Sequence, residues 1–143
     1  MNVTRRTVLL AAASAVVAQA ASRALAAGEA PAAAPAGALA DAAGKCVVVG
    51  DACLQHCLDL LGKGDTTLAE CAQSVRQMLA ICAAVGPIAA AGGKYLKSTA
   101  RVCLDVCTDC EQVCRKHEAH HAVCKECADA CARVIVECKK VLA

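Results

Sequence analysis

The segment CLDVCTDCEQVC, at residues 103–114, decides the fold of this chain. Its four cysteines follow one another at steps of four, three and four residues. These steps return a side chain to one face of an α-helix, whereas a β-strand would need steps of two. Asp105, Asp109 and Glu111 lie off the cysteine face. The segment therefore predicts a helix with a thiol face turned inward and a charged face in solvent.

The other nine cysteines extend this pattern to three more helices. Their groups have steps of 7 and 4, of 11, and of 3, 4 and 7 residues, all of which are helical. Breaks at residues 62–65 and 86–93 hold glycine and proline, which end or kink a helix. Residues 67–70, TLAE, have the capping-box pattern that starts a helix. We expect the third helix at about 95–116 and the fourth after a turn at 117–119.

These elements predict an all-α fold, an antiparallel up-down four-helix bundle with a cysteine-lined core, over residues 39–143. Met78 lies on the inward stripe of the second helix, seven residues after Cys71 and four before Cys82, so its thioether is an auxiliary candidate ligand. The candidate metal ligands are all thirteen cysteines: Cys46, Cys53, Cys57, Cys71, Cys82, Cys103, Cys107, Cys110, Cys114, Cys124, Cys127, Cys131 and Cys138.

The first 26 residues resemble a twin-arginine signal peptide. Arg5 and Arg6 precede an apolar run at residues 8–18, which is too short to span a bilayer, and an A-x-A cleavage pattern follows at residues 24–26. Residues 27–38 are rich in alanine and proline and predict a flexible tether. We expect export by the twin-arginine route to the periplasm, without stable membrane insertion after cleavage.

Composition excludes several classes of function. The chain has 143 residues, 1% aromatic residues and a formal net charge of +2. Residues 1–26 hold three arginines and no acidic residue, so their removal leaves a net charge of −1. Nucleic-acid binding by base stacking or by a basic patch is therefore excluded. The sequence also has no phosphate-binding loop and no nucleophile with an adjacent base, so we expect no enzyme.

Thirteen inward thiols have three general explanations. Cysteine as a small hydrophobic residue accounts for one or two of them. A disulfide scaffold suits an exported protein, but helical neighbours have Cβ atoms about 5–6 Å apart, which is too far for a disulfide. Metal binding accounts for the whole set. Two alternatives stay open: an iron–sulfur electron-transfer protein, best supported by Cys107, Cys110 and Cys114, and a metal-free redox thiol protein.

Charge balance favours Cu(I) among the soft metals that thiolates bind. Four thiolates around Zn(II) leave two negative charges at every site, which is unfavourable in a buried core. One Cu(I) neutralises one thiolate, and bridging thiolates keep ions and sulfurs near a ratio of one to one. Cu(I) also accepts two sulfurs in a nearly linear arrangement. We therefore expect multiple Cu(I) ions per chain, on the order of ten.

The cysteine rows, the segment CLQHC at residues 53–57 and the run at 103–114 resemble the copper storage proteins, over about residues 45–142. The resemblance implies storage of Cu(I), copper enzymes or copper chaperones as partners, and assembly as a homotetramer. The cysteine number and the signal peptide are similar to the exported members of that family. Those members carry methionines beside a histidine at an open end of the bundle. Here the positions near His56 are Leu60, Leu61, Lys63 and Leu68.

A group of histidines offers a substitute for those methionines. In an up-down bundle the turns after the first and third helices lie at the same end. His56 is near the first of these turns, and the second holds His117, His120 and His121. We hypothesise that the four imidazoles capture copper and pass it to the nearest thiols, Cys57, Cys114 and Cys124.

Overall fold

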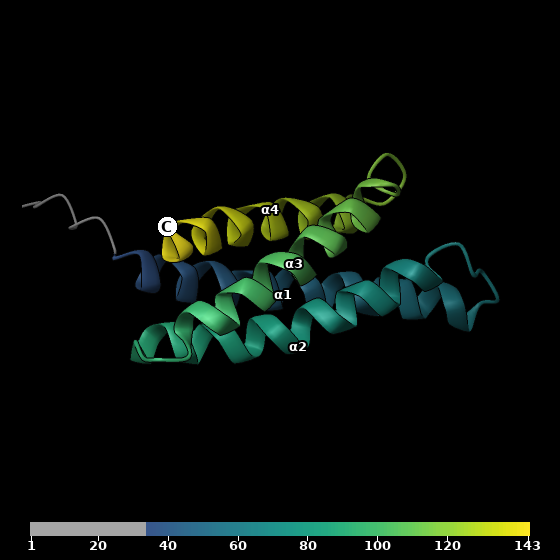
Figure 1. Ribbon diagram of the computed structural model, residues 1–143. Coiled ribbons are helices and arrows are strands. Elements are labelled where there is room, and N and C mark those ends of the chain that lie inside the picture. Colours follow the sequence, from purple (N-terminus) through teal and green to yellow (C-terminus); the bar gives the residue numbers. More distant parts are fainter. Residues whose placement is uncertain (1–33) are drawn as a thin grey trace, which may run out of the picture.

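The computed structural model describes residues 34–143, so the predicted signal peptide and residues 27–33 of the tether lie outside the described residues. The described part forms four helices: α1 Pro35–Gly62, α2 Ala69–Ala91, α3 Leu96–Arg115 and α4 Ala122–Leu142. These helices confirm the predicted all-α bundle (Figure 1). Their connections are short, at residues 63–68, 92–95 and 116–121.

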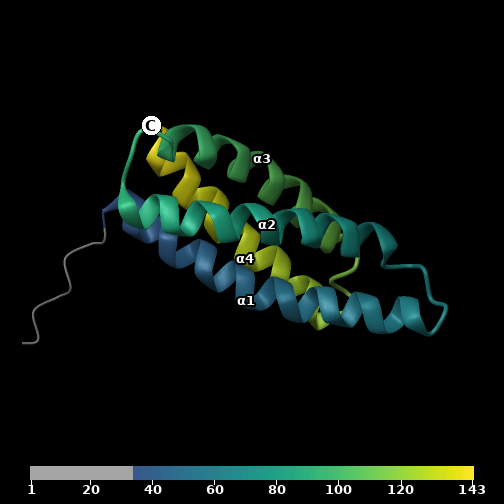
Figure 2. The same ribbon diagram turned by 90° about the horizontal axis from the view of Figure 1, so that it is seen from below.

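The helices pack in a square arrangement. α1 and α3 each contact α2 and α4, whereas the diagonal pairs, α1 with α3 and α2 with α4, make no backbone contact. Consecutive helices run in opposite directions, as two perpendicular views show (Figures 1 and 2). The connections at 63–68 and 116–121 therefore lie at one end, called here the histidine end. The connection at 92–95 lies at the opposite end, called here the distal end.

Helix α1 begins earlier than the sequence predicts. Pro35 occupies its first turn, so residues 35–38, expected in the tether, are helical. Proline suits this position because its fixed φ is helical and its missing N–H would have no partner there. The helix ends at Gly62, and Gly64 then turns the chain with φ of +85°.

The predicted capping box at the start of α2 is wrong. Leu68 is the N-cap residue, and no side chain caps the helix. The hydroxyl of Thr67 instead donates to Oδ1 of Asp65 over 2.7 Å, and the backbone N–H of Thr67 donates to the same oxygen over 2.9 Å. This local turn uses the hydroxyl that a capping box would need, so the N-cap moves from Thr67 to Leu68 and α2 starts one residue later, at Ala69. The helix continues past Pro87 and ends where Gly92 adopts φ of +59°.

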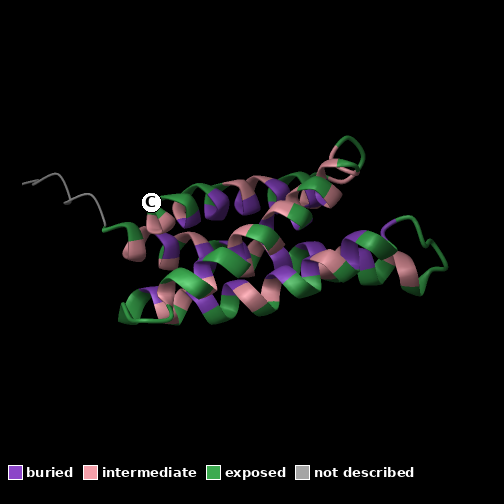
Figure 3. Cartoon of the chain, viewed as in Figure 1, coloured by how far each residue is buried: buried purple, intermediate pink, exposed green. Residues whose placement is uncertain are grey.

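The core consists of thiols and small aliphatic side chains. Buried residues line the inner faces of all four helices, and exposed residues lie outside (Figure 3). The described residues include no buried polar or charged side chain. The largest fully buried side chains that are not cysteine are Leu39, Leu68, Val75, Met78, Val85 and Val134. Tyr95, the one aromatic residue of the chain, is 62% exposed at the distal end.

Helix α2 is long and apolar enough to cross a membrane by length and composition alone. In the structure it packs against α1 and α3 as part of the bundle. Its inner face carries Cys71, Val75, Met78 and Cys82, all of which are buried. The apolar stretch of this helix is 28% buried, so the core accounts for part of its apolar character.

Candidate metal centre

All thirteen cysteines are buried and free, with exposed fractions of 0% or 1%. The shortest thiol–thiol hydrogen bond joins Sγ of Cys71 and Sγ of Cys114 over 3.5 Å, far longer than a disulfide bond of about 2 Å. The helical steps seen in the sequence explain why every thiol points inward, because each step keeps the side chain on the packed face. The centre of the bundle is thus a continuous region of thiol groups.

Seven thiols form one connected cluster, called here the histidine-end cluster. Three groups of three have sulfur atoms that all lie within 4.8 Å of one another. Two of these groups share Cys53, and two share Cys127, so the groups merge. Every helix contributes to the cluster, whose members are Cys53, Cys71, Cys110, Cys114, Cys124, Cys127 and Cys131.

A smaller cluster of Cys82, Cys103 and Cys107, called here the distal cluster, lies toward the other end. The sulfur of Cys107 is 3.7 Å from that of Cys82 and 3.9 Å from that of Cys103, its neighbour one turn away on α3. Between the two clusters lies Cys46, whose sulfur is 3.9 Å from that of Cys131. The thiols therefore extend from one cluster to the other through Cys46.

The protonation of these thiols follows from burial and from their mutual hydrogen bonds. Burial raises the pKa of Cys57, because no cation offsets the charge of a thiolate in an apolar core. In the pair Cys103 and Cys107, the shared hydrogen bond raises the pKa of Cys107 and lowers that of Cys103. A cation that enters the core must therefore displace protons, and it removes the unfavourable charge as it does so.

The geometry suits ions shared between sulfurs. Metal–thiolate bonds of about 2.3 Å place three sulfurs around one ion about 4 Å apart, and two sulfurs in line about 4.6 Å apart. Hydrogen-bonded thiols have sulfur separations of 3.5 to 4.0 Å, and the sulfurs of each group of three lie within 4.8 Å of one another, which is compatible with this range. No side chain that carries oxygen or nitrogen is buried as a whole among the described residues, although Oε2 of the half-buried Glu137 is itself buried. The donor set is therefore almost wholly sulfur and favours a soft metal ion.

Three of the four predicted histidines come together at the histidine end. Nε2 of His56 lies 3.0 Å from Nδ1 of His121, and the His117 ring centroid is 6.5 Å from that of His121. All three side chains are partly buried. His120 lies in the same connection but is exposed, and it stands outside this group of rings. In the sequence, His56 directly precedes Cys57, and His121 lies one turn before Cys124.

Ion pairs hold the connection that carries these histidines. Nζ of Lys116 lies 3.1 Å from Oε1 of Glu70, which joins the end of α3 to the start of α2. Arg115 binds three carboxylates on α3, the connection and α4, those of Glu111, Glu118 and Asp129. For the charges off the cysteine face, such as Glu111, the sequence predicts only a surface in solvent. Their pairing depends on which helices become neighbours, so the spacing of the cysteines carries no signal for it.

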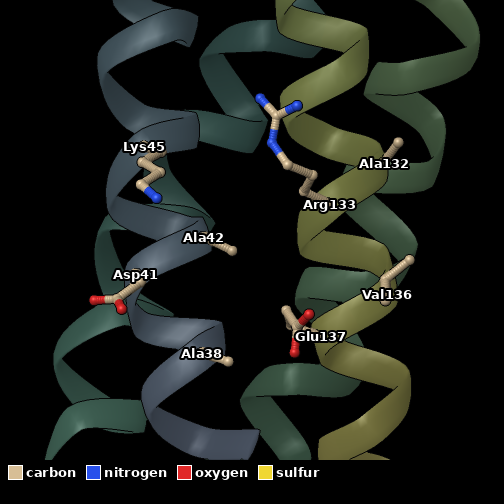
Figure 4. A pocket seen from close by; sticks show the side chains of 8 residues that line it. All are labelled: Ala38, Asp41, Ala42, Lys45, Ala132, Arg133, Val136 and Glu137. Atoms are coloured by element: carbon tan, nitrogen blue, oxygen red, sulfur yellow. The ribbon is translucent and has the colours of Figure 1, made fainter. Parts of the chain in front are cut away.

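A surface groove lies outside the thiol core, between α1 and α4 (Figure 4). Its residues come from these two helices, and none of them is a cysteine: Ala38, Asp41, Ala42, Lys45, Ala132, Arg133, Val136 and Glu137. Alanine, valine and four charged side chains line it, so it is distinct from the sulfur sites.

Comparison with known proteins agrees with the cysteine core. A search among curated proteins gave no match. The sequence profile of a family described as copper storage protein matches residues 32–143, which include all four helices and every cysteine. The chain therefore belongs to the copper storage protein family.

Proposed function

We propose that this protein stores Cu(I) and holds many ions per chain in its thiol core. The observation that carries the proposal is the connected set of buried, unoxidised thiols, supplied by all four helices. Its sulfur separations suit ions that share thiolates. The role is non-catalytic, in keeping with the family.

Charge favours Cu(I) as the stored ion. Each Cu(I) that replaces one thiol proton leaves the core neutral, whereas a divalent ion bound by three or four thiolates leaves it negative. With thirteen thiols and bridging sulfurs, this ratio gives a capacity on the order of ten ions. The exchange is a substitution of ion for proton and moves no electrons.

Copper uptake is proposed to occur at the histidine end. His56 and His121 are within hydrogen-bonding distance of each other, and their neighbours in sequence lead to Cys57 and Cys124. Imidazole binds Cu(I) less strongly than thiolate does, so it suits capture and release rather than storage. His117 contributes a third ring, while the exposed position of His120 favours no such role.

Place of action and partners follow from the sequence. The predicted twin-arginine signal supports export of the protein to the periplasm, where it supplies copper enzymes directly or through copper chaperones.

The family resemblance supports a homotetramer. Sedimentation of the purified protein measures this assembly.

An anaerobic titration tests the storage proposal. The reduced protein is titrated with Cu(I) in the presence of a coloured Cu(I) chelator. We expect on the order of ten equivalents to bind before the chelator gains colour, since shared thiolates are needed to hold so many ions. Chelator colour after one or two equivalents would refute storage. Brown colour in the isolated protein would instead support an iron–sulfur centre.

A further inference from the structure

Met78 is the one thioether in the described part of the chain, and it lies at the junction of the two thiol clusters. The thiol of Cys46 donates a hydrogen bond to Sδ of Met78 over 3.3 Å, and the sulfur of Cys46 is 3.9 Å from that of Cys131. Cys131 belongs to the histidine-end cluster. Cys82 and Cys107 of the distal cluster are also hydrogen-bonding neighbours of Cys46. A thioether thus stands where the two clusters meet.

The packing of α1 against α2 holds this thioether in place. Met78 is fully buried, and its terminal methyl group lies over Gly50 of α1. A Cβ at residue 50 would lie 2.6 Å from Cε of Met78, so only glycine leaves room for the methyl in this position. The sulfur is therefore set beside Cys46 by a specific gap in the facing helix.

The chemistry at this point differs from that of the other sites. A thioether is a soft, neutral donor that binds Cu(I) without adding a negative charge. Cys131 is shared with a neighbouring group of three thiols, so an ion bound there already balances its charge. Cys46 then supplies the single negative charge that one more Cu(I) requires. Three sulfurs around one ion lie about 4 Å apart, which is close to the separations at Cys46.

We infer that Cys46, Cys131 and Met78 form a Cu(I) site that joins the histidine-end cluster to the distal cluster. The inference rests on the proposed storage function. When Cu(I) binds, the proton of the thiol–thioether hydrogen bond is released to solvent, and the ion takes its place between the sulfurs of Cys46 and Met78.

Selenium labelling tests the site directly, because the chain has two methionines and one of them is Met1. The full chain is produced with selenomethionine, loaded with Cu(I) in steps, and measured by X-ray absorption at the selenium edge. We expect copper to be detected as a scattering neighbour of selenium as loading proceeds. The Met78→Leu variant, with the same label, reports Met1 alone and is expected to show no copper neighbour.

Capacity separates this inference from the storage proposal. Met78→Leu is expected to bind about one equivalent fewer than the wild type. Val75→Ile, which alters packing one turn away on the same face without removing sulfur, is expected to keep the full capacity. Binding of many equivalents with no copper neighbour at selenium would overturn the Met78 site and leave storage standing. Binding of only one or two would overturn storage, and the selenium spectrum would still decide whether Met78 is a ligand.

Discussion

Two glycines inside α1 measure how closely this helix packs against α2. Gly44 is exposed, and a Cβ added there would meet no atom within 4 Å. Gly50 is buried, and a Cβ added there would lie 2.6 Å from Cε of Met78 and 2.9 Å from Cδ2 of Leu79. We expect Gly44→Ala to stabilise the metal-free protein and Gly50→Ala to destabilise it.

The magnitudes follow from two opposing effects. Replacing a helical glycine by alanine stabilises a helix by about 1 kcal/mol, because alanine loses less backbone entropy on folding. Nothing opposes this gain at Gly44. At Gly50 the added methyl overpacks the contact between α1 and α2, which costs about 1–3 kcal/mol. Both clashing atoms end flexible side chains, so a value of about 2 kcal/mol is expected and the net loss is about 1 kcal/mol. The two variants should then differ by about 2 kcal/mol.

Urea unfolding of the reduced, metal-free protein measures this difference. Far-UV circular dichroism follows the loss of helix under anaerobic conditions, and the free energies are compared at constant m. A cycle with Met78→Ala adds a second check, because removal of the clashing methyl should recover about 1 kcal/mol of the loss at Gly50. Equal stabilisation by both alanines would refute the close approach of Met78 to α1.

Three further results are expected. The His56→Ala variant should load several-fold more slowly from a Cu(I) donor, with unchanged capacity, while the His120→Ala variant should load at the normal rate. Stopped-flow mixing measures both rates. An unaffected rate for His56→Ala would contradict uptake at the histidine end. Because each Cu(I) displaces about one thiol proton, the apparent Kd in chelator competition should rise about tenfold for each unit by which the pH falls, and a pH-independent Kd would argue against this exchange. Burial raises the pKa of Cys57, so this thiol stays protonated in the folded state, whereas it ionises in the unfolded chain above about pH 8.5. The metal-free protein should therefore lose stability as the pH rises beyond that value, and this group should have no effect on stability below it. Urea midpoints that stay level up to about pH 10 would contradict this expectation.

The helices and their inward faces could be predicted because the cysteines recur at the spacing of the helical repeat. The meeting of His56 with His121 could also be anticipated, since an up-down bundle brings the first and third connections together. Which two rings pair depends on the position of α1 relative to the connection at 116–121. The spacing of residues within one helix gives no information on that position.

Other features could not be predicted because they depend on contacts between helices. Gly50 gave only the weak signal of a glycine inside a helix, and its purpose emerges when Met78 of α2 is placed against it. The hydroxyl of Thr67 could cap the start of α2 or bind Asp65, and in the structure it donates a hydrogen bond to Asp65. The position of Pro35 at the start of α1 shows that an alanine- and proline-rich segment continues as helix where a bundle offers packing.

The scarcity of large apolar side chains in the core has a consequence for the lifetime of the protein in the cell. A thiol core gains less from burial than one of leucine and phenylalanine, so the empty bundle opens more often. Ions that bind only the closed bundle suppress that opening in proportion to their affinity. Proteases that cut the opened chain would therefore destroy empty molecules before filled ones. Bound copper would protect the protein from degradation, and proteolysis would leave mainly molecules that still carry copper.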